Sequence, residues 1–123
     1  MKILLDTHIF LWALAEPEKL DARARAMLET RANTIYVSAI TVAELTIKAS
    51  LGKLPLPFSP VEMIERSGFE MLDFSGNDAL VLQDMPFHHR DPFDRMLIAQ
   101  ALAHDFHLMS RDEKFTAYAC KLI

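Results

Sequence analysis

The stretch KILLDTHIFLWALA, residues 2–15, decides the class of fold to which the chain belongs. Its first part, Lys2 to Asp6, is an apolar run with the length and composition of a short buried strand. The apolar residues from His8 to Ala15 predict a helix that ends near Glu16 and Pro17. A buried strand that leads directly into a helix is the repeating unit of α/β proteins.

The same alternation of strands and helices continues to the end of the chain. Further strands are predicted at residues 34–38, 69–74, 107–110 and 119–123, which are rich in β-branched, aromatic or other apolar residues. Further helices are predicted at residues 22–30, 39–51, 60–67, 76–85, 92–104 and 112–117. This order predicts a parallel sheet with helices on both faces, in which ligands bind beyond the carboxyl ends of the strands.

The size and composition are those of one ordinary globular domain. The chain has 123 residues, 51% of them apolar and 24% charged, so we expect a single domain over residues 1–123. No apolar run approaches the roughly 20 residues of a membrane span. The N-terminus lacks the pattern of a signal peptide, so a cytoplasmic location is expected. The net charge of −4 argues against a nucleic-acid binder that relies on a basic surface alone.

Four acidic residues interrupt apolar sequence in four different segments. Asp6 ends the first predicted strand, and Glu44 lies inside an apolar helix. Asp94 opens another helix, and Asp112 follows the fourth strand. A carboxylate beside a core is costly unless it is paired, hydrogen-bonded or bound to a metal. Because the fold should bring these segments together, the four acids suggest one shared site.

Asp6 and Glu44 each have an ordinary structural explanation as well. Asp6 is well placed to cap the following helix, although capping and metal ligation use different carboxylate oxygens. Glu44 resembles the second member of a capping box with Thr41, and it has Lys48 four residues on as a favourable ion-pair partner. If Ser38 is the N-cap, however, Glu44 lies in the second turn, too far into the helix to cap it.

Asp94 and Asp112 are open to the same kind of explanation. With Asp91 as N-cap, Asp94 becomes an acid in the first helical turn, where the helix dipole favours negative charge. Asp94 nevertheless shares a helical stripe with Ile98, which places it at the end of an inward face and leaves Asp91 the better candidate for capping alone. Asp112 begins a short helix, and its candidacy depends on its position just beyond a strand.

Other polar residues give weaker signals. His88, His89 and Arg90 form a loop that we expect to be solvated rather than ligating. The chain has no glycine-rich phosphate loop and no nucleophile elbow, and its one cysteine has no partner base nearby. Carboxylate oxygens are therefore the main candidate ligands, and they favour a hard cation such as Mg²⁺ or Mn²⁺.

Four stretches of the chain together resemble the PIN-domain ribonucleases, and specifically the VapC toxins of toxin–antitoxin pairs. The stretches are ILLDTH at residues 3–8, SAITVAEL at 38–45, HRDPFDRMLIAQA at 89–101 and MSRD at 109–112. The third is the most specific, and the resemblance spans nearly the whole chain. It implies a PIN-like three-layer α/β/α sandwich with a five-stranded parallel sheet.

The resemblance also implies an endoribonuclease in which a cluster of four acids binds Mg²⁺ or Mn²⁺ and hydrolyses structured RNA such as tRNA or rRNA. Thr7 and Ser110 match hydroxyl positions found beside the metal in the family, and Asp91 is able to share the role of the third acid. Matched position by position, the four family acids correspond to Asp6, Glu44, Asp94 and Asp112.

Partners and substrate contacts follow from the same resemblance. It implies a homodimer and a cognate VapB antitoxin that blocks the site, assembled into a larger complex. The helix that carries Phe10, Leu11 and Trp12, together with residues 43–49, is the expected antitoxin groove. Basic residues near the acids are candidate contacts for RNA phosphates, and ion pairing with those acids is their alternative role. These candidates are Arg95, Arg111, Lys48 and Lys53.

Three other classes of protein compete with this interpretation. A phosphatase with an aspartate nucleophile would require a second Asp two residues after Asp6, where this chain has His8. A phospho-receiver domain would require an acid pair near the first strand and a lysine after the last. A non-catalytic binding module is the third alternative.

Overall fold

Five parallel strands form one sheet in the computed structural model, which describes residues 1–123. Their order across the sheet is β3-β2-β1-β4-β5, so β1 lies at the centre between β2 and β4. This confirms the predicted five-stranded parallel sheet, and the order differs from the 2-1-3-4-5 arrangement of phospho-receiver domains. The strands are β1 (Lys2–Leu5), β2 (Thr34–Ser38), β3 (Glu70–Leu72), β4 (His107–Met109) and β5 (Lys121–Leu122).

Six α-helices and three short 3₁₀ segments connect the strands. The α-helices are α1 (Thr7–Ala15), α2 (Ala22–Glu29), α3 (Ala39–Ser50), α4 (Pro60–Arg66), α5 (Gly76–Leu80) and α6 (Pro92–His104). The 3₁₀ segments are η1 (Pro17–Lys19), η2 (Val81–Asp84) and η3 (Glu113–Ala117). The single helix predicted at residues 76–85 is divided into α5 and η2. The edge strands β3 and β5 are shorter than predicted, because each has only one neighbour to pair with. None of the helices is long and apolar enough to cross a membrane.

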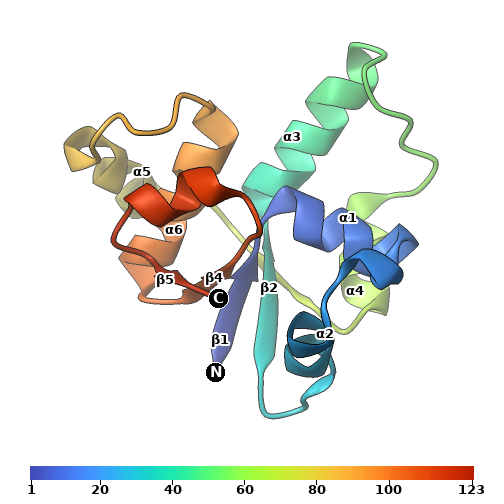
Figure 1. The fold of residues 1–123 in the computed structure, drawn as a ribbon. Coiled ribbons are helices and arrows are strands. Elements are labelled where there is room, and N and C mark those ends of the chain that lie inside the picture. The colour runs from blue at the N-terminus through green and yellow to red at the C-terminus, as the bar shows by residue number, and fades with distance from the viewer.

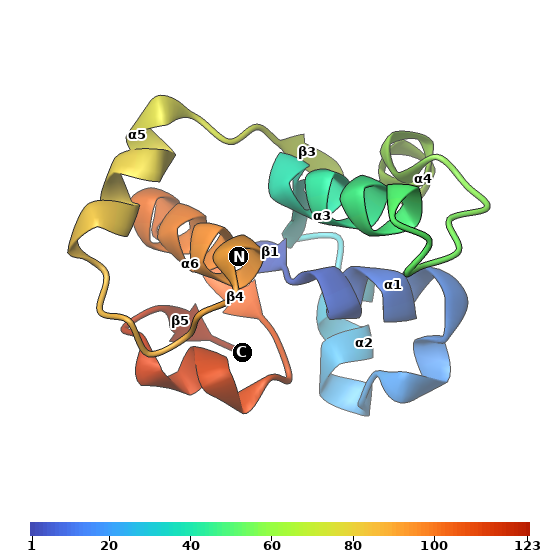
Figure 2. The same cartoon turned by 90° about the horizontal axis from the view of Figure 1, so that it is seen from above.

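The sheet lies between two layers of helices. Viewed from above, α5 and α6 lie on one side, and α1, α2 and α4 lie on the other (Figure 2). Successive residues of a strand face opposite sides, so Ile3 and Leu5 belong to the core under α1 and α2, whereas Leu4 belongs to the core under α6. All three side chains are fully buried. The predicted three-layer sandwich is confirmed.

Local capping interactions fix several helix boundaries at the predicted places. Asp21 accepts a hydrogen bond of 2.8 Å from the Ala24 amide at the start of α2. Ser59 does the same for the Glu62 amide at the start of α4, at 3.3 Å. Gly52, with a φ of +70°, ends α3 in the left-handed conformation that glycine adopts without steric cost.

The three central strands bring three segments together at the carboxyl edge of the sheet. The amide of Asp6, directly after β1, donates to the carbonyl of Met109 at the end of β4, at 3.0 Å. On the other side of β1, Leu5 is in register with Val37, so the start of α3 also lies beside Asp6. The segments that follow β1, β2 and β4 therefore begin side by side (Figure 1).

Candidate metal centre

Asp6 caps α1 at the carboxyl end of the central strand. Its Oδ1 accepts a hydrogen bond of 2.8 Å from the Ile9 amide, and the residue is 3% exposed. Burial raises the pKa of this carboxyl above its ordinary value, and the charge of Asp112 adds to the rise. Hydrogen bonds from Ser110 and from the Ile9 amide oppose it. The cap uses only one carboxylate oxygen, so it does not compete with metal ligation by the other.

Glu44 points from the second turn of α3 toward the start of α1. Its Oε1 accepts a hydrogen bond of 2.8 Å from Thr7 Oγ1, and its Oε2 pairs with Lys48 Nζ at 2.5 Å. Ser38 is the N-cap of α3, so Glu44 has no capping role. The hydrogen bond to Glu44 raises the pKa of Lys48 above its ordinary value. A buried hydroxyl and one ammonium group thus hold this carboxylate at the edge of the sheet.

Asp94 lies in the first turn of α6, and Asp91 is the N-cap of that helix. The Oδ1 of Asp91 accepts hydrogen bonds from the amides of Phe93 at 2.8 Å and Asp94 at 3.2 Å, which confirms its predicted capping role. Burial, and then repulsion from Asp91, raise the pKa of Asp94 from 3.8 to about 6. The charge of Glu44 also contributes to this rise, so the two acids interact across the site.

Asp112 joins the site from the segment after β4. Its Oδ1 accepts a hydrogen bond of 2.9 Å from the Lys114 amide, and its own amide donates to Ser110 Oγ at 3.1 Å. Ligand atoms of Asp94, Asp112 and His89 all lie within 4.8 Å of one another. Asp112 therefore interacts with Asp94 on one side and, through its charge, with Asp6 on the other.

The four acids form one cluster at the carboxyl edge of the sheet. Asp6 and Asp112 interact electrostatically, as do Asp94 and Glu44, and Thr7 joins the first and second segments through its hydrogen bond to Glu44. Several carboxylates in one place, with the pKa values of Asp6 and Asp94 raised, offer the oxygen ligands that a hard divalent cation prefers. Their role as metal ligands stays a prediction, and the geometry is compatible with it.

His89 is part of the same cluster, and the prediction that it is solvated was wrong. The residue is 6% exposed, and its Nε2 lies 2.8 Å from Asp94 Oδ2. The Asp91 amide lies 3.4 Å from Nδ1, which favours the tautomer with the proton on Nε2. The backbone of His89 is fixed by the hydroxyl of Tyr118, which accepts its amide hydrogen bond at 2.8 Å. Tyr118 lies 29 residues further along the chain, so no local pattern in the sequence indicated this contact.

Comparison with known proteins identifies the family. The family model of the PIN domain matches residues 3–121. The chain belongs to the PIN domain family. This PIN domain is 25% identical over 119 residues to Ribonuclease VapC22 of Mycobacterium tuberculosis (strain ATCC 25618 / H37Rv), covering 94% of this chain and 91% of that protein. The resemblance inferred from the sequence is therefore confirmed.

Solved structures share the fold of this PIN domain. The crystal structure of VapBC2 from Rickettsia felis bound to a DNA fragment from their promoter contains a chain with a TM-score of 0.70 and 19% identity, covering 100% of this chain and 98% of that one. A chain of FitAcB from Neisseria gonorrhoeae has a TM-score of 0.66 and 24% identity, covering 98% and 96% respectively. At these identities the similarity concerns the fold.

The two arginines predicted to contact RNA phosphates differ in their burial in this PIN domain. Arg95 is 7% exposed, and its Nη1 donates to the carbonyl of Pro86 at 2.9 Å and to the hydroxyl of Tyr118 at 3.2 Å. Its position in α6 directs the side chain toward the interior of the protein, where it binds the loop that precedes α6. Arg111 pairs with Asp21 at 3.0 Å and donates to the carbonyl of Ile123 at 2.9 Å. The burial of Arg95 contradicts its predicted contact with RNA phosphates. Arg111 is exposed and lines a cavity with Asp6 and Asp112, so its phosphate contact stays a prediction.

The two lysines differ from each other. Lys48 pairs with Glu44, as the alternative interpretation of the sequence proposed. Lys53 is exposed and forms no ion pair, and it follows the end of α3 that points away from the sheet edge (Figure 1). Lys53 is therefore not placed to bind a phosphate at the acids.

The predicted antitoxin groove also needs a correction. Phe10 is fully buried in the core under α1, so it is not available to a partner. Leu11 and Trp12 are partly buried and pack against the same core. The helices α1 and α3 are linked at the start of α1, where Thr7 donates a hydrogen bond to Glu44.

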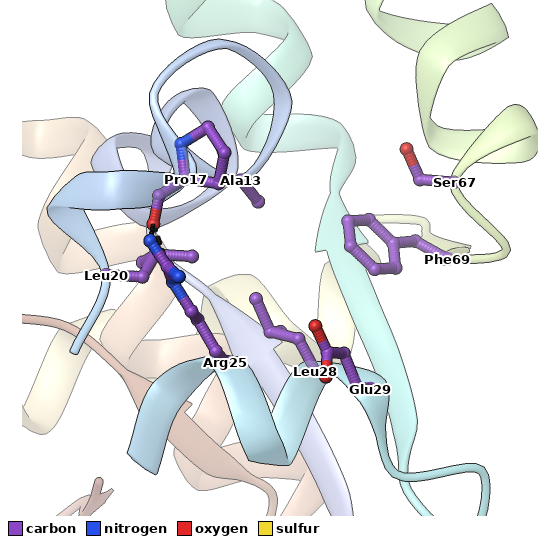
Figure 3. Close-up of a pocket in the computed structure, with 8 residues that line it drawn as sticks. All are labelled: Ala13, Pro17, Leu20, Arg25, Leu28, Glu29, Ser67 and Phe69. Atoms are coloured by element: carbon purple, nitrogen blue, oxygen red, sulfur yellow. Dashed lines mark hydrogen bonds between the residues drawn. The ribbon is translucent and has the colours of Figure 1, made fainter. Parts of the chain in front are cut away.

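A polar cavity of this PIN domain contains part of the acid cluster. It has a volume of about 500 Å³ and no apolar lining residue. Its lining residues are His8, His88, His89, Arg90, Asp91, Asp94, Asp112 and Lys114. A more apolar pocket of about 370 Å³ lies elsewhere, where Leu28 of α2 and Phe69 point toward each other (Figure 3). That pocket includes none of the four acids, so it is not a candidate for the metal centre.

Proposed function

We propose that this protein is a metal-dependent endoribonuclease, the toxin of a VapBC-type toxin–antitoxin module, with Mg²⁺ or Mn²⁺ as cofactor. The convergence of four acids at the carboxyl edge of a PIN domain is the observation that carries the proposal. The similarity to Ribonuclease VapC22 supports RNA as the substrate class. Hydrolysis of a phosphodiester bond in structured RNA, such as tRNA or rRNA, is the proposed reaction.

The donor set suits a hard divalent cation. The acids offer carboxylate oxygens, which Mg²⁺ and Mn²⁺ prefer to the nitrogen and sulfur ligands of softer metals. We assign Asp6, Glu44 and Asp94 as the principal ligands and Asp112 as the residue that completes the site. A bound cation would neutralise the charge of the acids and of the RNA phosphate. It would also activate water for an in-line displacement at phosphorus.

Neighbouring side chains orient the acids for this chemistry. Thr7 donates to Oε1 of Glu44, which restrains the rotation of that carboxylate. His89 lies against Oδ2 of Asp94 and leaves the other oxygen for a ligand role. Ser110 interacts with Asp6 and accepts a hydrogen bond from the Asp112 amide, so it connects the segments after β1 and β4.

Arg90 and Lys114 are further proposed contacts for RNA phosphates, in place of the buried Arg95. Both are exposed, both line the polar cavity beside Asp94 and Asp112, and neither forms an ion pair within the protein. Cations without an internal partner are able to release counterions from RNA, which makes the binding salt-dependent. RNA affinity falls as the salt concentration rises, and replacing either residue by Gln should make this fall shallower. The slope of log affinity against log salt concentration should decrease in magnitude by about 1.

A VapB-type antitoxin and a second copy of the chain are the proposed protein partners. The similar structures from Rickettsia felis and Salmonella typhimurium are VapBC complexes bound to DNA, which supports this proposal. Coexpression with the product of a neighbouring small open reading frame should relieve toxicity and yield a stable complex. Sedimentation analysis of the isolated toxin tests the homodimer.

Cleavage of RNA by the purified protein tests the proposed reaction. We expect fragments from tRNA or rRNA in the presence of Mg²⁺ or Mn²⁺ and none in excess chelator. Asp6→Asn should abolish cleavage and keep the fold, because asparagine retains an oxygen that accepts the Ile9 amide. Asp84→Asn, which changes an exposed acid outside the cluster, is the matched control and should cleave as the wild type does.

Full activity of Asp6→Asn, or full activity in chelator, would contradict the proposal. Hydrolysis of a phosphomonoester, or transfer of phosphate from acetyl phosphate to Asp6, would instead favour the phosphatase or receiver alternative. Sequencing of RNA ends from cells that express the protein identifies the RNA and the cleavage site.

A further inference from the structure

A second cavity opens directly beside the acid cluster. Its volume is about 250 Å³, and it shares His8 and Asp112 with the polar cavity described above. Asp112 therefore lies where the two cavities meet, with Asp94 in the polar cavity and Asp6 in the second one. The lining of the second cavity consists of Asp6, His8, Ile9, Trp12, Arg111 and Asp112.

An aromatic wall distinguishes this second cavity. His8 and Trp12 are four residues apart on α1, so they lie on the same face of the helix one turn apart. Their ring centroids are 6.4 Å apart and their planes are inclined by 49°. Trp12 is partly buried and packs against the core, which fixes the indole, whereas His8 is exposed. The ring position is set by α1, whose N-cap is Asp6.

The two cavities offer complementary surfaces to a nucleic-acid strand. The polar cavity has the cations Arg90 and Lys114 and no apolar residue, as suits phosphates and sugars. The second cavity adds the indole of Trp12 and the ring of His8 to the edge of the acid cluster, as suits a flat base. Proteins that bind single-stranded nucleic acid combine a basic surface for the backbone with aromatic side chains on which bases stack.

We propose that the cavity of Trp12 and His8 is a nucleobase subsite, which holds the base of the nucleotide next to the scissile phosphate. The inference rests on the proposed ribonuclease function and adds to it the position of one base. A strand that crosses the acids places its phosphates toward Arg90 and Lys114 and one base against the indole. The recognised ligand is an unpaired base of RNA, because a base in a duplex has both faces stacked.

Trp12 is the only tryptophan of the chain, so its fluorescence reports on this cavity alone. The test uses the Asp94→Asn protein with Mg²⁺, in which the RNA stays intact. The probes are a decamer of adenosine nucleotides and an abasic ribose-phosphate decamer of equal charge. Because both probes have the same phosphates, any difference between them measures binding of the bases.

The base-bearing decamer should quench Trp12 fluorescence and bind more tightly than the abasic one. Loss of one stacking partner costs about 1–3 kcal/mol per base, so His8→Ala should weaken binding of the base-bearing decamer about 5- to 150-fold. The same variant should bind the abasic decamer as before, and His8→Phe should restore the difference. His8 is exposed, so these variants should keep the fold, which circular dichroism checks.

Equal affinity for both decamers, without quenching, would overturn the inference. Quenching by the antitoxin but not by RNA would also overturn it and assign the cavity to the protein partner. These outcomes are separate from failure of the proposed function, which would appear as absence of RNA cleavage by the wild type with Mg²⁺ or Mn²⁺.

Discussion

Replacement of Asp94 by Asn should make the metal-free protein more stable while it removes activity. The carboxyl of Asp94 is buried beside Asp91 and near Glu44, and these surroundings raise its pKa from 3.8 to about 6. The folded state therefore disfavours the charged form at neutral pH. Asparagine removes the charge and keeps an oxygen that accepts a hydrogen bond from His89.

The size of the effect follows from the pKa of Asp94. Because one pKa unit is worth about 1.4 kcal/mol, a rise from 3.8 to about 6 destabilises the folded protein at pH 7.5 by about 3 kcal/mol. The substitution also loses the attraction between the carboxylate and the N-terminus of α6, worth about 0.3–1 kcal/mol. We therefore expect Asp94→Asn to raise the free energy of unfolding by about 2 kcal/mol.

The pH dependence has a definite sign. A carboxyl whose pKa is raised on folding binds its proton more tightly in the folded state, so its contribution to stability is fully present below its unfolded pKa, 3.8. That contribution is lost as the pH rises through about 6, the folded pKa. The advantage of the Asn variant should therefore be largest above this range and should vanish as the pH approaches 3.8.

Urea unfolding in EDTA at several pH values measures the difference, with Asp84→Asn as an exposed control that should change stability by less than about 0.5 kcal/mol. Added Mg²⁺ should stabilise the wild type by about 2.7 kcal/mol at a hundredfold excess over Kd, and the Asn variant much less. An Asn variant no more stable than the wild type at pH 7.5, or an advantage that persists unchanged toward pH 4, would refute the reasoning.

Three further substitutions test individual contacts. His89→Phe removes the donor to the Asp94 carboxylate and should weaken Mn²⁺ binding, measured by calorimetry, about 10- to 100-fold. His89→Gln should restore much of the affinity. If His89→Phe binds Mn²⁺ as tightly as the wild type, His89 has no role in orienting Asp94. Thr7→Val removes the hydrogen bond to Glu44 and should cost about 1.5–3 kcal/mol in urea unfolding, because the acceptor is charged; no loss would mean that the bond is replaced by water. Arg95→Met leaves the Tyr118 hydroxyl and two carbonyls without their donor and should destabilise the protein by about 2 kcal/mol or more, without a specific loss of RNA affinity at equal folded fraction.

Local sequence determined the elements and their ends. The apolar run before Asp6 forms β1, and Ser38 and Asp91 cap the helices that follow them, as predicted. These features depend on hydrogen bonds and burial within a few residues of the chain, which a single sequence specifies directly. The edge strands were less predictable, because their length depends on the neighbour with which they pair.

The acids of the site were identifiable because each one is out of place in its own segment. A buried carboxylate such as that of Glu44 is costly, and the cost is visible as a charge inside an apolar stripe. Alternation of strands and helices was enough to expect these segments at the same edge of the sheet. Family resemblance then made the expectation specific, residue by residue.

The surroundings of the acids were decided only by the tertiary structure. Arg95 faces inward rather than toward a substrate, and His89 lies against Asp94 rather than in solvent, because both depend on Tyr118, which is 23 and 29 residues away. The order of the strands sets which loops meet and therefore which cations remain free beside the acids. A sequence specifies interactions between near neighbours in the chain. Contacts between distant segments arise only after the sheet has assembled, and here those contacts decide which side chains surround the acids and which cations beside them remain unpaired.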